Sequence, residues 1–161
     1  MTLLASAPGW LAALLLLLLV MAALEDLWRL EINNWLWGAV ALGAFLAVAM
    51  NGPVGGLWQN LLLFAAVLGF GTLLFARGWM GGGDIKLLAA CSLWFDLDQG
   101  WKMLVAVAIA GGLETLLIMV LRSLPWPSAL RNRLLVLKRE EEIPYGVAIC
   151  VGVALIGLAA R

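Results

Sequence analysis

The sequence predicts an all-α, polytopic membrane protein with about six transmembrane helices and both termini outside, on the periplasmic side. Of its 161 residues, 65% are hydrophobic and only 12% are charged, and the mean hydropathy is +1.04. Such an apolar fraction is far above that of a soluble domain and indicates a chain that lies in a lipid bilayer. The charged residues lie almost entirely between apolar runs, and the formal net charge of zero indicates no nucleic-acid partner.

Each apolar run is bounded by charges or by Gly and Pro, and each predicts one helix. A spanning helix needs roughly 20 apolar residues, so the fourth run is unusually short. Glu25 and Asp26 follow the first run where a signal peptide would have small residues, so we expect a retained helix. We expect one domain over residues 1–161, because no soluble domain or repeat interrupts it. The predicted helices are Trp10–Leu24, Trp35–Met50, Leu57–Ala76, Ile85–Phe95, Met103–Leu121 and Pro144–Ala160.

Local signals mark the ends of these helices. Asn33 and Asn34 are expected to cap the second helix, and residues 51–53 (Asn-Gly-Pro) to end it. Residues 81–83 (Gly-Gly-Gly) are expected to break the chain before the fourth helix, and Pro144 suits the first turn of the sixth. All nine tryptophans fall at or near predicted helix ends, which is typical of an interfacial aromatic belt.

The distribution of basic residues predicts the orientation. With six helices, the connections at 25–34, 77–84 and 122–143 share one side of the membrane. These connections and the adjoining helix ends carry eight of the ten Lys and Arg residues, and the opposite side has only Lys102 and Arg161. Because basic residues are retained in the cytoplasm, the three connections are expected inside and both termini outside.

The absence of histidine limits the possible chemistry. It excludes Ser-His and Cys-His catalysis and most zinc or iron sites, so acid-base chemistry must come from carboxylates, Lys, Tyr or Cys. Cys91 and Cys150 lie within apolar runs and are expected to act as small hydrophobic residues. We expect neither a metal nor a cofactor, and the sequence indicates no particular oligomeric state.

Asp84 follows the three glycines and could simply cap the fourth helix. The span from Ile85 to Leu97 covers only roughly 20 Å, against about 30 Å of hydrocarbon, which would place Asp84 about 10 Å below the inner surface in non-helical backbone. Non-helical backbone at that depth requires a protein-enclosed or water-filled cavity, and a carboxyl group there indicates a functional site. The sequence therefore predicts an aqueous pocket at Asp84.

Asp26 lies at the inner end of the first helix, about 24 Å from Trp10, so it can meet Asp84. Taken alone, Asp26 is more simply an interfacial acid beside Arg29. Two carboxyl groups in a shielded site do not both ionise, so one can activate water while the other polarises an amide carbonyl. This pairing predicts peptide hydrolysis. A proton-coupled transporter and a non-catalytic assembly protein are the alternatives.

The segments around both aspartates resemble the type IV prepilin peptidases, a family of intramembrane Gly-x-Gly-Asp aspartic peptidases. Residues 81–88 (Gly-Gly-Gly-Asp-Ile-Lys-Leu-Leu) are similar to the second aspartate motif of the family. Residues 26–34 resemble its first motif, with Asn33 in place of the usual proline. Residues 143–149 (Ile-Pro-Tyr-Gly-Val-Ala-Ile) open the last helix as in the family.

The resemblance implies a substrate, a location and a set of site residues. The substrate would be a prepilin or pseudopilin whose short basic leader is cut after a glycine at the cytoplasmic boundary of the bacterial inner membrane. The chain lacks the cysteine-paired cytoplasmic loop of larger members and resembles the short form of tight-adherence (Flp-type) pili, so methyltransferase activity is not expected. The expected residues are Asp26 and Asp84 in catalysis, Gly81, Gly82, Gly83 and Lys86 in shaping the site, and Asn34, Pro144, Tyr145 and Gly146 in substrate binding.

Other charged and amphipathic features leave alternatives open. Lys86 lies about 200° around a helix from Asp84, so it either extends to the inner interface or shapes the electrostatics of the site. Glu114, inside the fifth helix, is protonated, faces the cavity or pairs with a basic residue. Residues 130–137 form a short surface helix or a linker, and Glu140, Glu141 and Glu142 are either a solvated run or a binding site for the basic leader.

Overall fold

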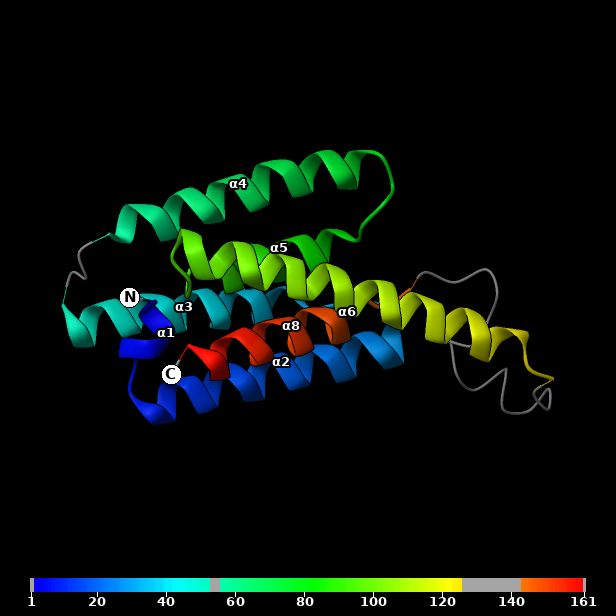
Figure 1. Cartoon of the computed structure of the whole chain (residues 1–161), viewed down its shortest axis with the longest axis horizontal. Helices are drawn as coiled ribbons and strands as arrows, with labels where there is room; N and C mark the ends of the chain where they lie inside the picture. Colours follow the sequence, from blue (N-terminus) through cyan, green and yellow to red (C-terminus); the bar gives the residue numbers. More distant parts are fainter. Residues whose placement is uncertain (1, 53–55, 126–142, 161) are drawn as a thin grey trace.

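A computed structural model of the chain describes residues 2–52, 56–125 and 143–160 (Figure 1). These residues form helices and no strand, so the predicted all-α class is confirmed for the described part of the chain. The predicted features at 130–137 and 140–142 lie outside the described residues. The helices are α1 (Leu3–Ser6), α2 (Gly9–Arg29), α3 (Asn34–Asn51), α4 (Leu57–Ala76), α5 (Gly82–Ser92), α6 (Leu97–Ser123) and α8 (Gly146–Ala159).

Each predicted run coincides with a helix, but several boundaries differ. α6 begins before the predicted Met103, because Asp96 caps it by accepting a hydrogen bond of 2.9 Å from the backbone N–H of Gln99. α8 begins at Gly146, so the prediction that Pro144 occupies its first turn is wrong, and Tyr145 is the N-cap. α1 was not predicted; the hydroxyl oxygen of Thr2 caps it by accepting from the N–H of Ala5.

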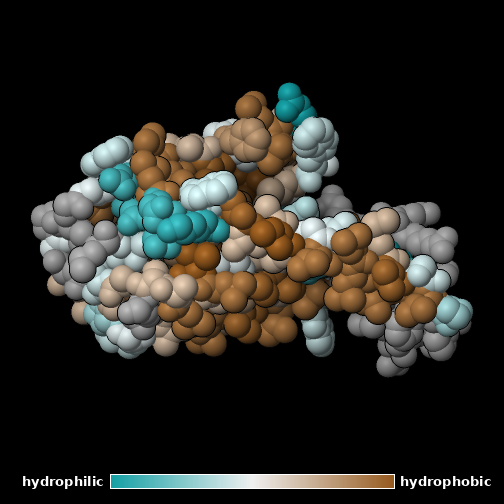
Figure 2. Space-filling model, in the orientation of Figure 1, coloured by the Kyte–Doolittle hydropathy of each residue, from teal (hydrophilic) through white to brown (hydrophobic). Residues whose placement is uncertain are grey.

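The apolar character of these helices makes the chain a membrane protein. Three of them, α2, α4 and α6, are long and apolar enough to cross a bilayer, while α3 and α8 are shorter apolar helices. Figure 2 shows apolar residues over most of one face of the molecule, and hydrophilic residues near the end where α6 begins. An apolar exterior of this kind suits contact with lipid.

The helices pack into a bundle with α5 and α8 as its internal elements. α8 packs against α2 and α6, and α5 packs against α3 and α4 (Figure 1). Long apolar side chains fill the space between these helices with almost no exposed surface, and they include Leu11, Leu15, Leu19, Leu36, Val40, Leu87, Met103 and Ile149.

The short helix α5 does not extend the full length of the bundle, and aromatic residues fill the space beyond its last turn. Trp94 and Phe95 follow it and are completely or almost completely buried. The indole N–H of Trp94 donates to the carbonyl of Val40 at 3.1 Å, and the Trp94 carbonyl accepts from the N–H of Leu4 at 3.2 Å. α1 therefore closes this end of the bundle.

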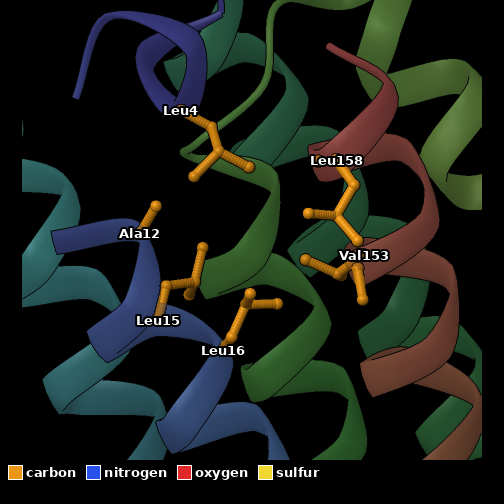
Figure 3. Close-up of a pocket in the computed structure, with 8 residues that line it drawn as sticks. Leu4, Ala12, Leu15, Leu16, Val153 and Leu158 are labelled. Carbon is orange, nitrogen blue, oxygen red and sulfur yellow. The ribbon is translucent and has the colours of Figure 1, made fainter. Parts of the chain in front are cut away.

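Close packing continues around α1. Figure 3 shows side chains from α1, α2 and α8 pointing toward a small apolar cavity of about 30 Å³. Leu4 comes from α1, Ala12, Leu15 and Leu16 come from α2, and Val153 and Leu158 come from α8. An apolar cavity this small offers water no hydrogen-bond partners, so this cavity is not a site for polar chemistry.

The two ends of the bundle differ in which chain segments they contain. Both termini lie at the end closed by α1, whereas α2, α4 and α6 end, and α3, α5 and α8 begin, at the opposite end (Figure 1). The three connections that the sequence predicts on one side of the membrane therefore leave from one end of the bundle.

Candidate active site

Two polar cavities adjoin at the end of the bundle where α5 begins. The first has a volume of about 380 Å³ and the second about 490 Å³. Asp26 and Asp84 line the first cavity together, and Asp84 also lines the second. The first cavity is further lined by Leu30, Glu31, Ile32, Asn34, Phe75, Gly81, Gly82, Gly83, Lys86 and Ile143.

Asp84 lies in the first turn of α5 and is buried, with 9% of its surface exposed. The prediction that Asp84 lies in non-helical backbone is wrong, because α5 begins at Gly82 and only the extended N-cap, Gly81, is outside the helix. Glycine keeps its backbone N–H, so Gly82 and Gly83 can provide the first N–H groups of the helix. The three glycines were expected to break the chain before the helix, but Gly81 is the N-cap and Gly82 and Gly83 are the first residues of α5.

The glycines before Asp84 allow close approach of neighbouring groups. A Cβ atom on Gly81 would lie 2.8 Å from Oδ2 of Asp84, so the carboxylate folds back over a position without a side chain. A Cβ atom on Gly83 would lie 3.2 Å from Cβ of Ile32, and one on Gly82 would lie 3.3 Å from the Phe75 ring. The beginning of α5 therefore fits tightly between the α2–α3 connection and the end of α4.

Asp26 lies in the last turns of α2 and is held by the beginning of α8. It is 3% exposed, and its Oδ2 accepts a hydrogen bond of 2.6 Å from the backbone N–H of Gly146. The first N–H groups of a helix lack partners within it and favour an anionic oxygen. A Cβ atom on Gly146 would lie 2.9 Å from both Cβ and Oδ2 of Asp26, so only glycine leaves room for the carboxylate there.

Asn34 and Lys86 form a polar contact on the wall of the first cavity. The ammonium group of Lys86 donates to Oδ1 of Asn34 at 3.0 Å, and the indole N–H of Trp37 donates to the same oxygen at 3.2 Å. Asn33 is the N-cap of α3, but its side chain accepts no hydrogen bond from the first turn, so the predicted side-chain cap is not formed. Its amide donates to the carboxylate of Glu25, which ties the start of α3 to α2.

The second cavity contains residues that sequence reasoning did not assign to the site. Thr115 and Arg122 of α6 line it, together with Tyr145 and the loop after α4. A Cβ atom on Gly111 would lie 2.8 Å from Cε1 of Tyr145, so the tyrosine ring packs directly on α6. The spacing from Gly111 to Thr115 and Arg122 places all three on one helix face, and this pattern was the available signal.

Pro144, which was expected to bind substrate, is buried. It precedes Tyr145, the N-cap of α8, so the chain passes from the cavity into α8 at these two residues. Glu114 lies within hydrogen-bonding reach of the backbone N–H of Ala148, and near enough to Asp26 for the two charges to interact. Its Oε2 is buried and has no hydrogen-bond partner among the residues described. Glu114 therefore joins α6 to the beginning of α8, next to the site.

The arrangement provides two buried carboxyl groups on a cavity large enough for water and a segment of polypeptide. Such a pair can supply both an acid and a base. In the described ranges, no group of three or more Cys, Asp or Glu side chains is placed to hold a metal ion.

Comparison with known proteins agrees with the motifs. A sequence model of the type IV leader peptidase family matches residues 13–122, which include Asp26 and Asp84. No curated protein and no solved structure matches the chain significantly. The family match covers more than half of the 161 residues and confirms the predicted family. The chain therefore belongs to the type IV leader peptidase family, a family of peptidases.

Proposed function

We propose that this protein is an aspartic endopeptidase in which Asp26 and Asp84 are the two catalytic carboxyl groups. The observation that carries the proposal is that two aspartates from α2 and α5, which are 3% and 9% exposed, line one cavity. Buried carboxyl groups are expensive in a membrane protein unless they serve a function. Membership of a peptidase family supports hydrolysis of a peptide bond as that function.

The mechanism uses the pair as one unit. The ionised aspartate removes a proton from a water molecule, which attacks the carbonyl carbon of the scissile amide, while the protonated aspartate donates a hydrogen bond to the carbonyl oxygen. The tetrahedral intermediate collapses when the C–N bond breaks and the leaving amine takes up a proton from the aspartate pair, which returns to its starting state with one proton. The N–H of Gly146 holds one oxygen of Asp26 during these steps. No covalent bond to the enzyme forms, and the two aspartates titrate together.

The substrate that we propose is a type IV prepilin or pseudopilin of the Flp type. The family implies a prepilin substrate. Its short basic leader would be removed after a glycine, with Glu31 and the ionised member of the Asp26–Asp84 pair providing negative charge on the first cavity. Asn34 and Tyr145, which line the two cavities, would contact the substrate, and Gly81, Gly82, Gly83 and Lys86 would shape the site. Pro144 and Gly146, which were also expected to bind substrate, are buried, and Gly146 would instead hold Asp26.

The cleavage test compares wild-type protein with Asp26→Asn and Asp84→Asn, using a membrane-inserted Flp-type prepilin and sequencing the new N-terminus. We expect wild-type protein to cleave after the leader glycine. Both variants should lose this cleavage, because each lacks one of the two carboxyl groups that serve as acid and base. Asp98→Asn is the control, since Asp98 is exposed and paired with Lys102 at the far end of the bundle. Folded wild-type protein that cleaves none of several such prepilins would contradict the proposal and favour a proton-coupled transporter.

We also propose six transmembrane helices in the bacterial inner membrane, with the termini in the periplasm and the two aspartates at the cytoplasmic boundary. Among the described residues, Arg29, Arg77, Lys86 and Arg122 lie toward the end of the bundle that contains the aspartates, and Lys102 lies toward the other, which supports this orientation. Trp79 and Trp101 provide a matched test, because both are exposed, at 70% and 61%, and lie at opposite ends.

For this test, Trp79→Cys and Trp101→Cys are made in a background without Cys91 and Cys150. A membrane-impermeant maleimide added from the periplasm should label the variant at position 101, and reach position 79 only after the inner membrane is opened. The reverse pattern would overturn the orientation.

A further inference from the structure

An apolar groove lies between α4 and α6, with α5 as its floor. α4 packs mainly on α5 and contacts α6 much less (Figure 1). The space beside it has a volume of about 400 Å³, and all of its lining residues are apolar or glycine. We call this space the α4–α6 groove. One face of α4 provides most of its lining, through Leu63, Ala66, Val67, Phe70, Gly71 and Leu74.

The groove is closed at one end and open at the other. Near the beginning of α4, the side-chain amide of Asn60 donates to the carbonyl of Leu93 at 2.9 Å. There, a Cβ atom on Gly100 would lie 2.1 Å from Leu63, so α4 and α6 are in close contact. The two helices diverge toward the end of α4, where the second polar cavity lies between them (Figure 1). The groove therefore opens toward the aspartates.

The groove is continuous with the candidate active site. Met80 lines both the groove and the second polar cavity, which Asp84 borders. Ile85 lines the groove and directly follows Asp84 in the first turn of α5. An extended chain leaving the groove past Met80 therefore reaches a catalytic carboxylate within a few residues.

We propose that the α4–α6 groove binds the apolar transmembrane helix of the leader-bearing substrate and delivers the bond to be cut past Met80 to the aspartates. This inference rests on the function proposed above. The order of polar and apolar parts is the same in the enzyme and in the substrate. The acidic cavity would bind the basic leader, and the apolar groove would bind the apolar helix that follows the leader. Because one aspartate of the pair is protonated, the first cavity has two negative charges, on Glu31 and on the ionised aspartate, against one ammonium group, that of Lys86.

The dimensions and chemistry of the groove suit this occupant. The face of α4 from Leu63 to Leu74 extends for about 16 Å, which is three turns of a bound helix. A groove without polar lining groups excludes a charged ligand, because a buried charge would find no partner there. Continuity with the cavity of the aspartates favours the helix to be cleaved over a lipid chain or a second copy of this protein.

Adjacent alanines on α4 offer a matched pair of variants. Ala66 lines the groove, whereas Ala65 lies about 100° around the helix and outside it, and both are exposed. Ala66→Trp should fill the groove and lower kcat/KM for membrane-inserted prepilin by at least about tenfold, mainly by raising KM. Ala65→Trp should stay within about twofold of wild type. Equal effects of the two substitutions would overturn the groove assignment.

Photocrosslinking gives a second readout that does not depend on turnover. p-Benzoylphenylalanine is placed at position 66 or 65 in an Asp84→Asn background, which keeps the prepilin intact. We expect crosslinks to the transmembrane helix of the prepilin from position 66 and not from position 65. Crosslinks from position 66 to lipid alone, or to a second copy of the chain alone, would overturn the inference. Absence of cleavage by wild type would instead refute the proposed function, so the two failures are distinguishable.

Discussion

At the end of the bundle that contains both termini, α1, α2 and α8 enclose an apolar cavity of about 30 Å³, whereas at the other end polar cavities of about 380 and 490 Å³ separate the helices. The first end is filled by Trp94 and Phe95, which follow the short helix α5. The second end is where α5 begins, between the α2–α3 connection and the end of α4. One short helix therefore produces both a closed end and an open end.

Glycines contribute to both ends in different ways. At the closed end, a Cβ atom on Gly43 would lie 2.9 Å from the Trp94 ring, so glycine admits a large apolar group. At the open end, Gly81 and Gly146 leave room for the carboxylates of Asp84 and Asp26. Glycine therefore allows tight apolar packing at one end and leaves room for reactive groups at the other.

The largest expected effect on stability comes from the closed end. Trp94 is 1% exposed and donates a hydrogen bond to the carbonyl of Val40, so Trp94→Ala leaves a large cavity and removes this hydrogen bond. We expect a loss of about 3–5 kcal/mol in the free energy of unfolding. Thermal unfolding in detergent measures it, and cleavage per folded molecule should change little.

Trp101→Ala is the control for this substitution, because Trp101 is 61% exposed on α6. Its stability should remain close to that of wild type. If both variants lost the same stability, the closed end would not be the stabilising part of the bundle.

A smaller but more specific effect is expected at the open end. In Gly146→Ala, the new methyl group would lie 2.9 Å from Oδ2 of Asp26 and displace the carboxylate from its N–H partner. A displacement of about 1 Å at a catalytic group costs about a hundredfold in rate, so kcat should fall by about that factor while the protein stays folded.

Gly112→Ala provides the matched control for the glycine substitution. Gly112 is also helical, but a Cβ atom there meets nothing within 4 Å. This variant should cleave at nearly the wild-type rate. Equal activity of the two alanine variants would show that the position of Asp26 does not depend on Gly146.

The smallest effect compares one exposed lysine from each end. Lys86→Met removes the donor to Asn34 on the wall of the first cavity, and we expect kcat/KM to fall about threefold to tenfold. Lys102→Met removes only an exposed pair with Asp98, which contributes less than about 1 kcal/mol. Initial cleavage rates for both variants test the difference. An unchanged kcat/KM in Lys86→Met would show that Lys86 does not contribute to the function of the site.

Much of the fold could be predicted from composition, because apolar runs in a membrane protein correspond closely to helices. The range Leu57–Ala76 was predicted with the bounds that α4 has. Helix starts were less predictable. The extra turns of α5 and α6 depend on Gly82 and Asp96, where glycine or polar residues begin a helix that hydropathy alone does not detect.

The two aspartates and the pocket beside them could be identified as a candidate site from motif and depth, but the partners of the aspartates could not. The contact between Asp26 and Gly146 joins residues 120 positions apart, and no periodicity indicates it. Thr115 and Arg122 were missed for a similar reason. The sequence does not show that their face of α6 borders the cavity beside Asp84.

The sequence by itself determined that this is an apolar, helical chain with two carboxyl groups in motifs of the type IV leader peptidase family, because composition and local motifs are properties of short segments. Only the tertiary structure decided that these carboxyl groups line one cavity, that α8 holds Asp26, and that an apolar groove leads to Asp84. The physical reason is that these features depend on the distances between helices. Those distances follow from the packing of side chains, such as Trp94 against Gly43 and Leu63 against Gly100, that are far apart in the sequence.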